Sequence, residues 1–164
     1  MPLASLWHFG LCGEPMSEIV IQIITAALGS LGFALLYRLR PEHLPLATLG
    51  GAFVWGIYLL CLKYTENIFA AAMIATVFCT LYAEIFAKVQ KTPATVLLIP
   101  SVIPLIPGSA LYYTMSSIVQ RDLVEAWYYA RLTIQFALAI AIGISLVWTI
   151  WAVLFQRKNQ QQDN

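Results

Sequence analysis

Long apolar runs separated by short polar turns make up most of this chain. Each run approaches the roughly 20 residues that a helix needs to cross about 30 Å of hydrocarbon. The five runs cover residues 19–37, 44–62, 68–86, 94–115 and 132–155. The pattern therefore predicts an all-α integral membrane bundle of five transmembrane helices, forming a single transmembrane domain over residues 1–164.

Two stretches outside these runs have a different character. Residues 116–131 mix charged and aromatic side chains, which is typical of a segment lying at the lipid headgroups. Residues 156–164 are polar, and we expect a frayed tail there.

The composition supports a membrane protein. Hydrophobic residues make up 60% of the chain and charged residues 10%, whereas soluble domains carry about 25% charged residues. The lipid bilayer is therefore one predicted partner. The formal net charge is +1, and no cluster of Lys and Arg provides a phosphate-binding face, so the sequence predicts no nucleic-acid binding.

Basic residues in the short loops predict the orientation, because cytoplasmic loops are enriched in Lys and Arg. With the first loop inside, six basic residues are cytoplasmic: Arg38, Arg40, Lys88, Lys91, Arg157 and Lys158. Three are then outside: Lys63, Arg121 and Arg131. This difference favours an external N-terminus and a cytoplasmic C-terminus. A fourth run that turns back instead of crossing would invert the last helix.

The fourth run contains Pro100, Pro104 and Pro107, and Gly108 follows the last of them. Each proline removes a backbone donor and clashes with the preceding turn, and hydrocarbon offers no water to the freed carbonyls. On a helix the three prolines would share one face, within about 60° of one another. We predict that the span unwinds from Pro104 to Gly108, as membrane helices do at transporter substrate sites.

A packing helix that is merely kinked is the alternative, because proline is fairly common in membrane spans. Three prolines and a glycine within a short stretch favour the functional break. Ser101 and Ser109 flank the prolines, so these two side chains are candidate polar contacts for a substrate.

Glu84 is a second candidate for the substrate or ion pathway. It lies near the end of the third run, and a charge inside the bilayer costs about 2.5–3.5 kcal/mol on insertion scales, so it tends to be paired or functional. Lys88, four residues further on, is a ready partner on the same helical face. A boundary salt bridge therefore stands beside a gate, a proton-coupling carboxylate or a site for a substrate amine.

Small residues predict where helices approach each other, because they let backbones come close. Ordinary bundle packing is one use for them, and a face for a second subunit is the other. The candidates are Gly29, Gly32, Gly51, Gly56, Ala71, Ala75, the pair Ala139 and Gly143, and the repeat Ala137, Ala141 and Ser145.

The residues of common enzyme and metal sites are missing from the sequence. His8 and His43 lie outside the runs, and neither has metal-ligand spacing. The three cysteines, Cys12, Cys61 and Cys79, form no CxxC, and inert apolar roles are expected for them. There is no glycine-rich phosphate loop. The sequence therefore predicts no enzyme, no cofactor and no metal, and energy coupling through an ion gradient or a partner.

From Tyr82 to Met115 the chain reads YAEIFAKVQKTPATVLLIPSVIPLIPGSALYYTM. This run resembles the signature of the bacterial threonine/serine exporter (ThrE) family. The shared features are a membrane glutamate, a basic residue and a proline before the span, the motif PxxxPxxPG, and an aromatic end. More narrowly, the run is similar to the small subunit of the split, two-component form (YjjB type). Ser101 departs from the pattern, since many relatives have glycine there.

The resemblance implies a secondary transporter of the inner (plasma) membrane that exports threonine and serine, driven by the proton motive force. It also implies a larger membrane subunit as an obligate partner, matching the N-terminal half of the single-chain exporters. Glu84 would then be the coupling or gating carboxylate. There are three alternatives: an exporter of a dicarboxylate such as succinate, a scaffold subunit without substrate contact, and a homo-oligomeric channel.

Overall fold

The computed structural model describes the backbone of residues 16–160 and the side chains of residues 17–153. Within that range the chain is helical apart from short turns, which confirms the all-α prediction. Four helices are long and apolar enough to cross a membrane, and the bent pair formed by α4–η2 and α5 supplies a fifth. The elements are α1 (Met16–Leu36), α2 (Leu44–Thr65), α3 (Ile68–Val89), α4 (Ala94–Val102), the 3-10 helix η2 (Ile103–Leu105), α5 (Gly108–Val119) and α6 (Leu123–Gln160).

Charged residues in the left-handed conformation close four helices. Their φ angles lie between 51° and 61°. After three of them the next backbone N–H reaches back to the last helical turn; the nitrogen of Asp122, for example, lies 2.9 Å from the carbonyl oxygen of Ser117. This bond is the one that closes a Schellman C-cap. Each helix therefore ends where its sequence turns polar. The four residues are Arg38, Glu66, Lys91 and Arg121.

Two of these turns also begin the next helix. The Asn67 Oδ1 accepts hydrogen bonds from two backbone N–H groups at the start of α3, at 3.0 and 3.4 Å. The Asp122 Oδ1 does the same at the start of α6, at 3.2 and 3.1 Å. Such side chains satisfy donors that the first turn of a helix leaves free. The turns α2–α3 and α5–α6 are consequently short and well defined.

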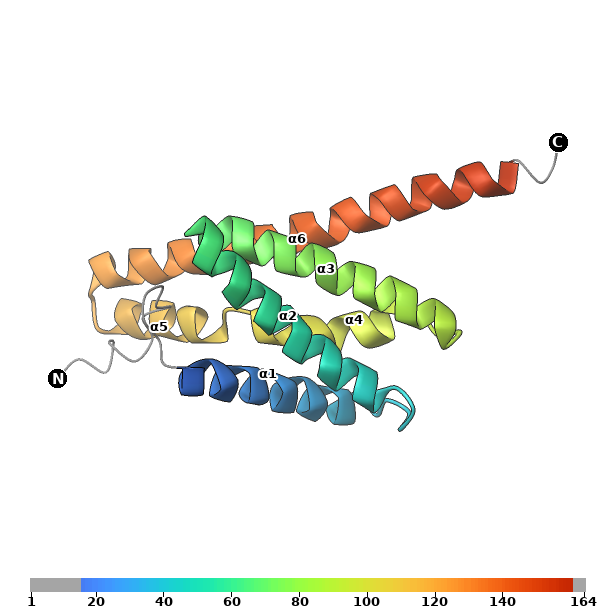
Figure 1. Cartoon of the computed structure of the whole chain (residues 1–164). Helices are drawn as coiled ribbons and strands as arrows, with labels where there is room; N and C mark the ends of the chain where they lie inside the picture. The colour runs from blue at the N-terminus through green and yellow to red at the C-terminus, as the bar shows by residue number, and fades with distance from the viewer. Residues whose placement is uncertain (1–15, 161–164) are drawn as a thin grey trace.

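The helices run back and forth along one bundle (Figure 1). The central helix is α3, which packs against α2, α4 and α6. The first helix, α1, packs on α2 and also touches α4 and η2, while α5 packs on α6. The chain of contacts from α1 to α6 means that α4 lies inside the bundle and α5 lies at its periphery.

The loops α1–α2 and α3–α4 meet at one end of the bundle (Figure 1). His43, at the start of α2, is buried and shares a hydrogen bond between its Nδ1 and the Oε1 of Gln90, the C-cap of α3. The Gln90 Nε2 also lies 3.5 Å from the carbonyl oxygen of Glu42. The basic residues of these two loops therefore belong to the same side of the molecule, as the orientation count assumes.

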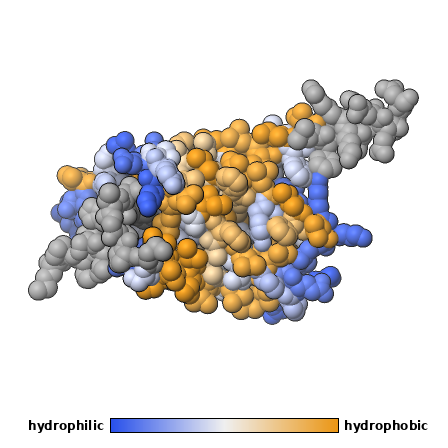
Figure 2. Space-filling view, in the orientation of Figure 1, coloured by the Kyte–Doolittle hydropathy of each residue, from blue (hydrophilic) through white to orange (hydrophobic). Residues whose placement is uncertain are grey.

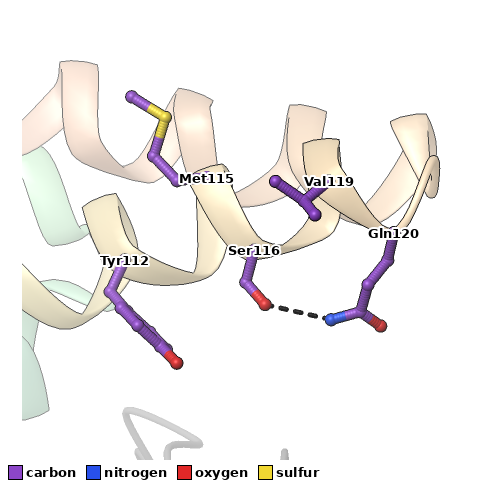
Figure 3. A pocket seen from close by; sticks show the side chains of 5 residues that line it. All are labelled: Tyr112, Met115, Ser116, Val119 and Gln120. Atoms are coloured by element: carbon purple, nitrogen blue, oxygen red, sulfur yellow. Dashed lines mark hydrogen bonds between the residues drawn. The ribbon is translucent and has the colours of Figure 1, made fainter.

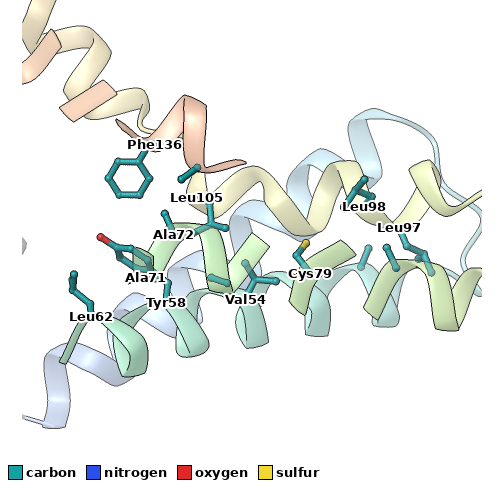
Figure 4. Close-up of a cluster of buried hydrophobic side chains, with 14 of the residues drawn as sticks. Val54, Tyr58, Leu62, Ala71, Ala72, Cys79, Leu97, Leu98, Leu105 and Phe136 are labelled. Atoms are coloured by element: carbon teal, nitrogen blue, oxygen red, sulfur yellow. The ribbon is translucent and has the colours of Figure 1, made fainter. Parts of the chain in front are cut away.

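The core is rich in alanine, and aromatic residues fill it at one end (Figure 4). Tyr58 and Phe136 are buried, with ring centroids 5.6 Å apart. Along α3 the buried face is mostly alanine, from Ala71 to Ala87. Small side chains let the neighbouring helices approach α3 from several directions.

The surface carries an apolar band between two polar ends. Figure 2 shows hydrophobic residues across the middle of the molecule and hydrophilic residues gathered at both ends. Large side chains such as Leu28, Phe53 and Ile134 are more than half exposed. In a membrane such a band faces lipid tails.

The structure adds helix bounds to two of the expected segments. In residues 116–131 the first four residues complete α5 and those from Leu123 onward belong to α6. The polar tail begins within the last turns of α6, which continues to Gln160. At 1.5 Å per residue this 38-residue helix is about 57 Å long, and its C-terminal part extends past the other helices (Figure 1).

Candidate transport site at the broken span

The fourth span breaks between Ile103 and Pro107. After α4 the chain makes the single turn of η2, then an extended residue, Ile106, with φ −68° and ψ 122°. Pro107 precedes α5, which begins at Gly108 and is bent by 51° from the first half. The break predicted from the prolines is confirmed, but Pro100 lies within α4 and contributes to the span before it breaks.

Proline chemistry explains the position of the break. Pro104 and Pro107 have no N–H, so the carbonyl groups four residues earlier lose their usual partners. The Ile103 carbonyl is instead taken by the N–H of Ile106 at 3.0 Å, and the Ile106 carbonyl by the N–H of Gly108 at 2.7 Å. No side chain caps the start of α5. The break therefore places backbone carbonyl groups at the end of η2 close to the free N–H groups in the first turn of α5.

The broken span crosses the bundle. A bend of 51° is far from a reversal, and α5 continues away from α4 to the opposite end, where α6 begins (Figure 1). The described part of α1 begins at that same end, and α6 finishes at the other (Figure 1). The described start of α1 and the end of α6 therefore lie at opposite ends of the bundle.

The predicted site residues around the break differ in their accessibility. Pro100 and Ser101 are fully buried, whereas Pro104, Pro107 and Ser109 are half-buried and Gly108 is exposed. The Ser101 Oγ lies 3.5 Å from the carbonyl oxygen of Ala47 in α2. In this conformation Ser101 holds two helices together, and Ser109 is the serine with access to the break.

Ser101 fits into a notch that α2 leaves at Gly50. A Cβ atom added at Gly50 would lie 2.2 Å from the Ser101 Oγ and 2.9 Å from the Cε1 of Tyr82 in α3. The Tyr82 hydroxyl donates a hydrogen bond to the carbonyl oxygen of Leu46 at 2.9 Å. Sequence reasoning missed both Gly50 and Tyr82. The adjacent glycines Gly50 and Gly51 were the signal available.

Glu84 lies away from this notch. It is half-buried and sits two residues after Tyr82, about 200° further round the axis of α3, on the opposite side of the helix. Thr76 and Lys88 lie eight residues before it and four residues after it, on the same side of α3, and both contact α6. Glu84 therefore faces the flank of α6, and the structure does not bring it together with the prolines.

A salt bridge between Glu84 and Lys88, one of the alternatives raised for Glu84, is absent from the part of the chain that the structure describes. The Lys88 Nζ lies 4.1 Å from the centroid of the Trp151 ring instead. A cation over an indole face is attracted by the ring quadrupole. Of the alternatives raised for Glu84, a pair with Lys88 is thus not the arrangement seen.

A shallow hollow lies on the outer side of α5 (Figure 3). Within it the Gln120 Nε2 donates a hydrogen bond to the Ser116 Oγ at 3.0 Å. The hollow contains none of the predicted site residues. Its lining consists of Tyr112, Met115, Ser116, Val119 and Gln120.

Metal-ligand groups do not gather within the described residues. No three side chains of His, Cys, Asp or Glu come together there as a metal site would require. Cys61 is half-buried and unpaired, and Cys79 is buried and unpaired in the core. Cys12 and His8 lie outside the described residues.

The glycines divide into two groups that sequence alone did not separate. A Cβ atom at Gly51 or Gly143 would overlap a neighbouring helix, whereas at Gly29, Gly32 and Gly56 it would meet no atom within 4 Å. On α6 the two sets of small residues also divide. Ala139 and Gly143 are buried against α3, while Ala137, Ala141 and Ser145 are exposed.

Comparison with known proteins identifies the family. No solved structure matches the chain. The family model described as threonine/serine exporter, ThrE, matches residues 22–150, from within α1 to within α6 and across the whole broken span. The chain therefore belongs to the threonine/serine exporter family and is a multi-pass membrane protein.

Proposed function

We propose that this chain is the small subunit of a two-component exporter of threonine and serine in the bacterial inner membrane. The family match carries the proposal, because it extends over all five crossings. In the family context a small polar amino acid is the expected substrate. The subunit works with a larger membrane subunit and uses the proton motive force.

The break in span four suits an amino acid zwitterion. Bare carbonyl groups attract an ammonium group, and the N-terminus of α5 attracts a carboxylate. The N-terminus of α5 lies at Gly108, with the Ser109 hydroxyl beside it. The Ile103 and Ile106 carbonyls already accept hydrogen bonds. The carbonyls proposed to meet an ammonium group are therefore those of Pro104 and Leu105. A substrate with an ammonium group and a carboxylate would be bound through both groups. A substrate with only one of these groups would be bound at one end only.

A partner subunit is supported by the peripheral position of α5. Among the described helices it packs chiefly on α6, and its opposite face carries exposed Leu111, Met115 and Ile118. The exposed small residues of α6, defined above, offer a second surface on which another membrane helix could lie close. A second copy of this chain is the competing occupant.

Glu84 is proposed as the coupling carboxylate, on the side of α3 that faces α6. An ion gradient is the energy source that this residue set can use, because the sequence lacks a phosphate loop. The excess of basic residues at the end formed by the α1–α2 and α3–α4 loops favours a cytoplasmic position for that end. The N-terminus is then outside.

A counterflow assay in vesicles tests the proposal. Vesicles with this chain and its larger partner are loaded with threonine, serine or succinate, with and without a proton gradient. We expect exchange of threonine and serine that requires both subunits and responds to an uncoupler. Exchange of succinate alone would support the dicarboxylate alternative, and conductance from this chain alone would support a homo-oligomeric channel.

Substitutions at the break distinguish a scaffold subunit from a subunit that takes part in transport. Pro104→Ala and Gly108→Ala are expected to slow threonine export while the complex still assembles. Gly29→Ala is the matched control, because a Cβ atom there meets nothing within 4 Å. Unchanged export from the two break variants in a stable complex would favour the scaffold.

A further inference from the structure

The two halves of the broken span are held very differently. Leu97, Leu98, Pro100 and Ser101 of α4 are at most 4% exposed. They are enclosed by α2 and α3, with α1 alongside. Ser101 in the notch at Gly50 attaches this half to α2, and Tyr82 closes the notch from α3. The first half is thus part of the packed core.

The second half is attached to α6 instead. The Tyr113 ring of α5 stacks on the Tyr129 ring of α6 with centroids 5.2 Å apart. The Ser117 Oγ donates a hydrogen bond to the Glu125 Oε2 at 3.4 Å, and Asp122 caps α6 directly after the turn. These contacts make α5 and the first turns of α6 one hairpin, which is joined to the core through α6.

Between the halves, η2 still packs on α1 and α2 through the buried Leu105, and the chain leaves this packing only from Ile106 onward, where Ile106 and Gly108 are exposed. Ile106 is extended, and Pro104 and Pro107 donate no hydrogen bonds. Gly108 is exposed, and a Cβ atom there would meet nothing within 4 Å. Open space beside a segment without a continuous hydrogen-bond ladder permits a change of angle at low cost.

We infer that span four is a joint with a fixed half, α4 with η2, and a moving half, the α5–α6 hairpin, which turns about Ile106–Gly108. Gly50 and Tyr82 are positioning residues that hold the fixed half. On the far side the moving part of α6 ends before Phe136, which is buried against Tyr58 of α2. This motion rests on the proposed function, for which it would open and close the break.

Distances between spin labels test the joint in the complex with its partner subunit. In a variant without the natural cysteines, one pair joins Leu28→Cys on α1 to Met115→Cys on α5, across the joint. The control pair joins Leu28→Cys to Ile99→Cys on α4, on the fixed side. All three side chains are exposed in this chain. Met115 lies on the face proposed for the partner subunit, so the labelled chain is first shown to assemble with the partner.

We expect the 28–115 distance to be broad or to shift by about 5 Å, the size of a one-turn helix shift, when threonine and a proton gradient are present. The 28–99 distance should stay narrow and unchanged. A 28–115 distribution as narrow and constant as the control would overturn the joint. The same vesicles report export, so vesicles that move no threonine contradict the proposed function separately.

Substitution of Gly50 tests the fixed half. Gly50→Ala places a methyl group against Ser101 and Tyr82, and the Ser101 Oγ can rotate away while its Cβ, 3.0 Å distant, cannot. We expect the 28–99 distance to broaden and export to fall about tenfold, in proportion to the overpacking. The double variant Gly50→Ala/Ser101→Gly should restore most of both, because it removes the overlap with the serine side chain and leaves only the contact with the Tyr82 ring.

A merely structural role gives a different result. If Gly50→Ala lowers only the amount of complex, with an unchanged 28–99 distance and normal export per complex, Gly50 does not position α4. Tyr82→Phe removes only the hydrogen bond to Leu46 and keeps the ring in place. It should broaden the 28–99 distance less than Gly50→Ala, and no broadening in either variant overturns the role of the notch.

Discussion

Thr76 of α3 occupies the space beside Gly143 of α6. A Cβ atom added at Gly143 would lie 2.9 Å from the Thr76 Cβ and 3.2 Å from the carbonyl oxygen of Met73. The Thr76 hydroxyl already donates a hydrogen bond to the carbonyl of Ala72 at 2.7 Å, so its side chain cannot turn away without losing that bond. This contact sets how closely α6 can approach the centre of the bundle.

Gly143→Ala should therefore separate α3 from α6. We expect the protein to lose about 1–3 kcal/mol of stability, the usual cost of overpacking a core. The measurement is the unfolding midpoint in detergent. Gly56→Ala is the control, because nothing lies within 4 Å of its Cβ position, and it should be neutral or slightly stabilising. Equal midpoints for both variants would contradict the contact.

Ser30 and Gly51 form a similar contact between α1 and α2, with a buried hydroxyl. The Ser30 Oγ has no hydrogen-bond partner among the described residues, and it lies 1.8 Å from where a Cβ atom at Gly51 would be. Ser30→Ala should raise stability by about 1 kcal/mol, because it removes an unsatisfied buried polar group. A large loss of stability would show that the hydroxyl has a partner after all.

Glu84→Gln should abolish threonine export while the complex assembles normally. Glutamine has almost the same shape as glutamate but cannot release a proton, so only the coupling step is lost. The measurement is efflux from vesicles with an imposed pH gradient. Glu66→Gln, in the exposed α2–α3 turn, is the control and should export normally. Normal efflux from the Glu84 variant would remove this residue from the mechanism.

Cysteine accessibility tests the crossing of span four. In a cysteine-free background, Lys63→Cys and Arg121→Cys should react with an impermeant maleimide added outside intact cells. Arg38→Cys and Lys91→Cys should react only after lysis, because their loops lie at the other end of the bundle (Figure 1). A span that turned back would place Arg121 with Lys91. Reaction of Arg121→Cys only after lysis, as for Lys91→Cys, would contradict the crossing of span four.

The hydrogen bond between His43 and Gln90 shows what sequence reasoning could not reach. Neither residue has a neighbour along the chain that indicates a partner, since they lie 47 residues apart. The predicted lack of metal-ligand spacing at His43 said nothing about what else its ring would bind. Only the packing of α2 beside the end of α3 brings the two side chains together.

The sequence by itself determined the number of apolar helical segments, the approximate positions of most of their ends and the break. These depend on local properties: the length of an apolar run, a charged residue that ends it, and the missing N–H of Pro104 and Pro107. The tertiary structure decided which side of each helix is buried. Lipid tails are as apolar as a leucine core, so no periodicity distinguishes Gly50, Gly51 and Gly143 from Gly29, Gly32 and Gly56. The tertiary structure also decided three features of the candidate site, because each depends on a neighbouring helix. They are the burial of Ser101, the separation of Glu84 from the prolines and the contact of Lys88 with Trp151.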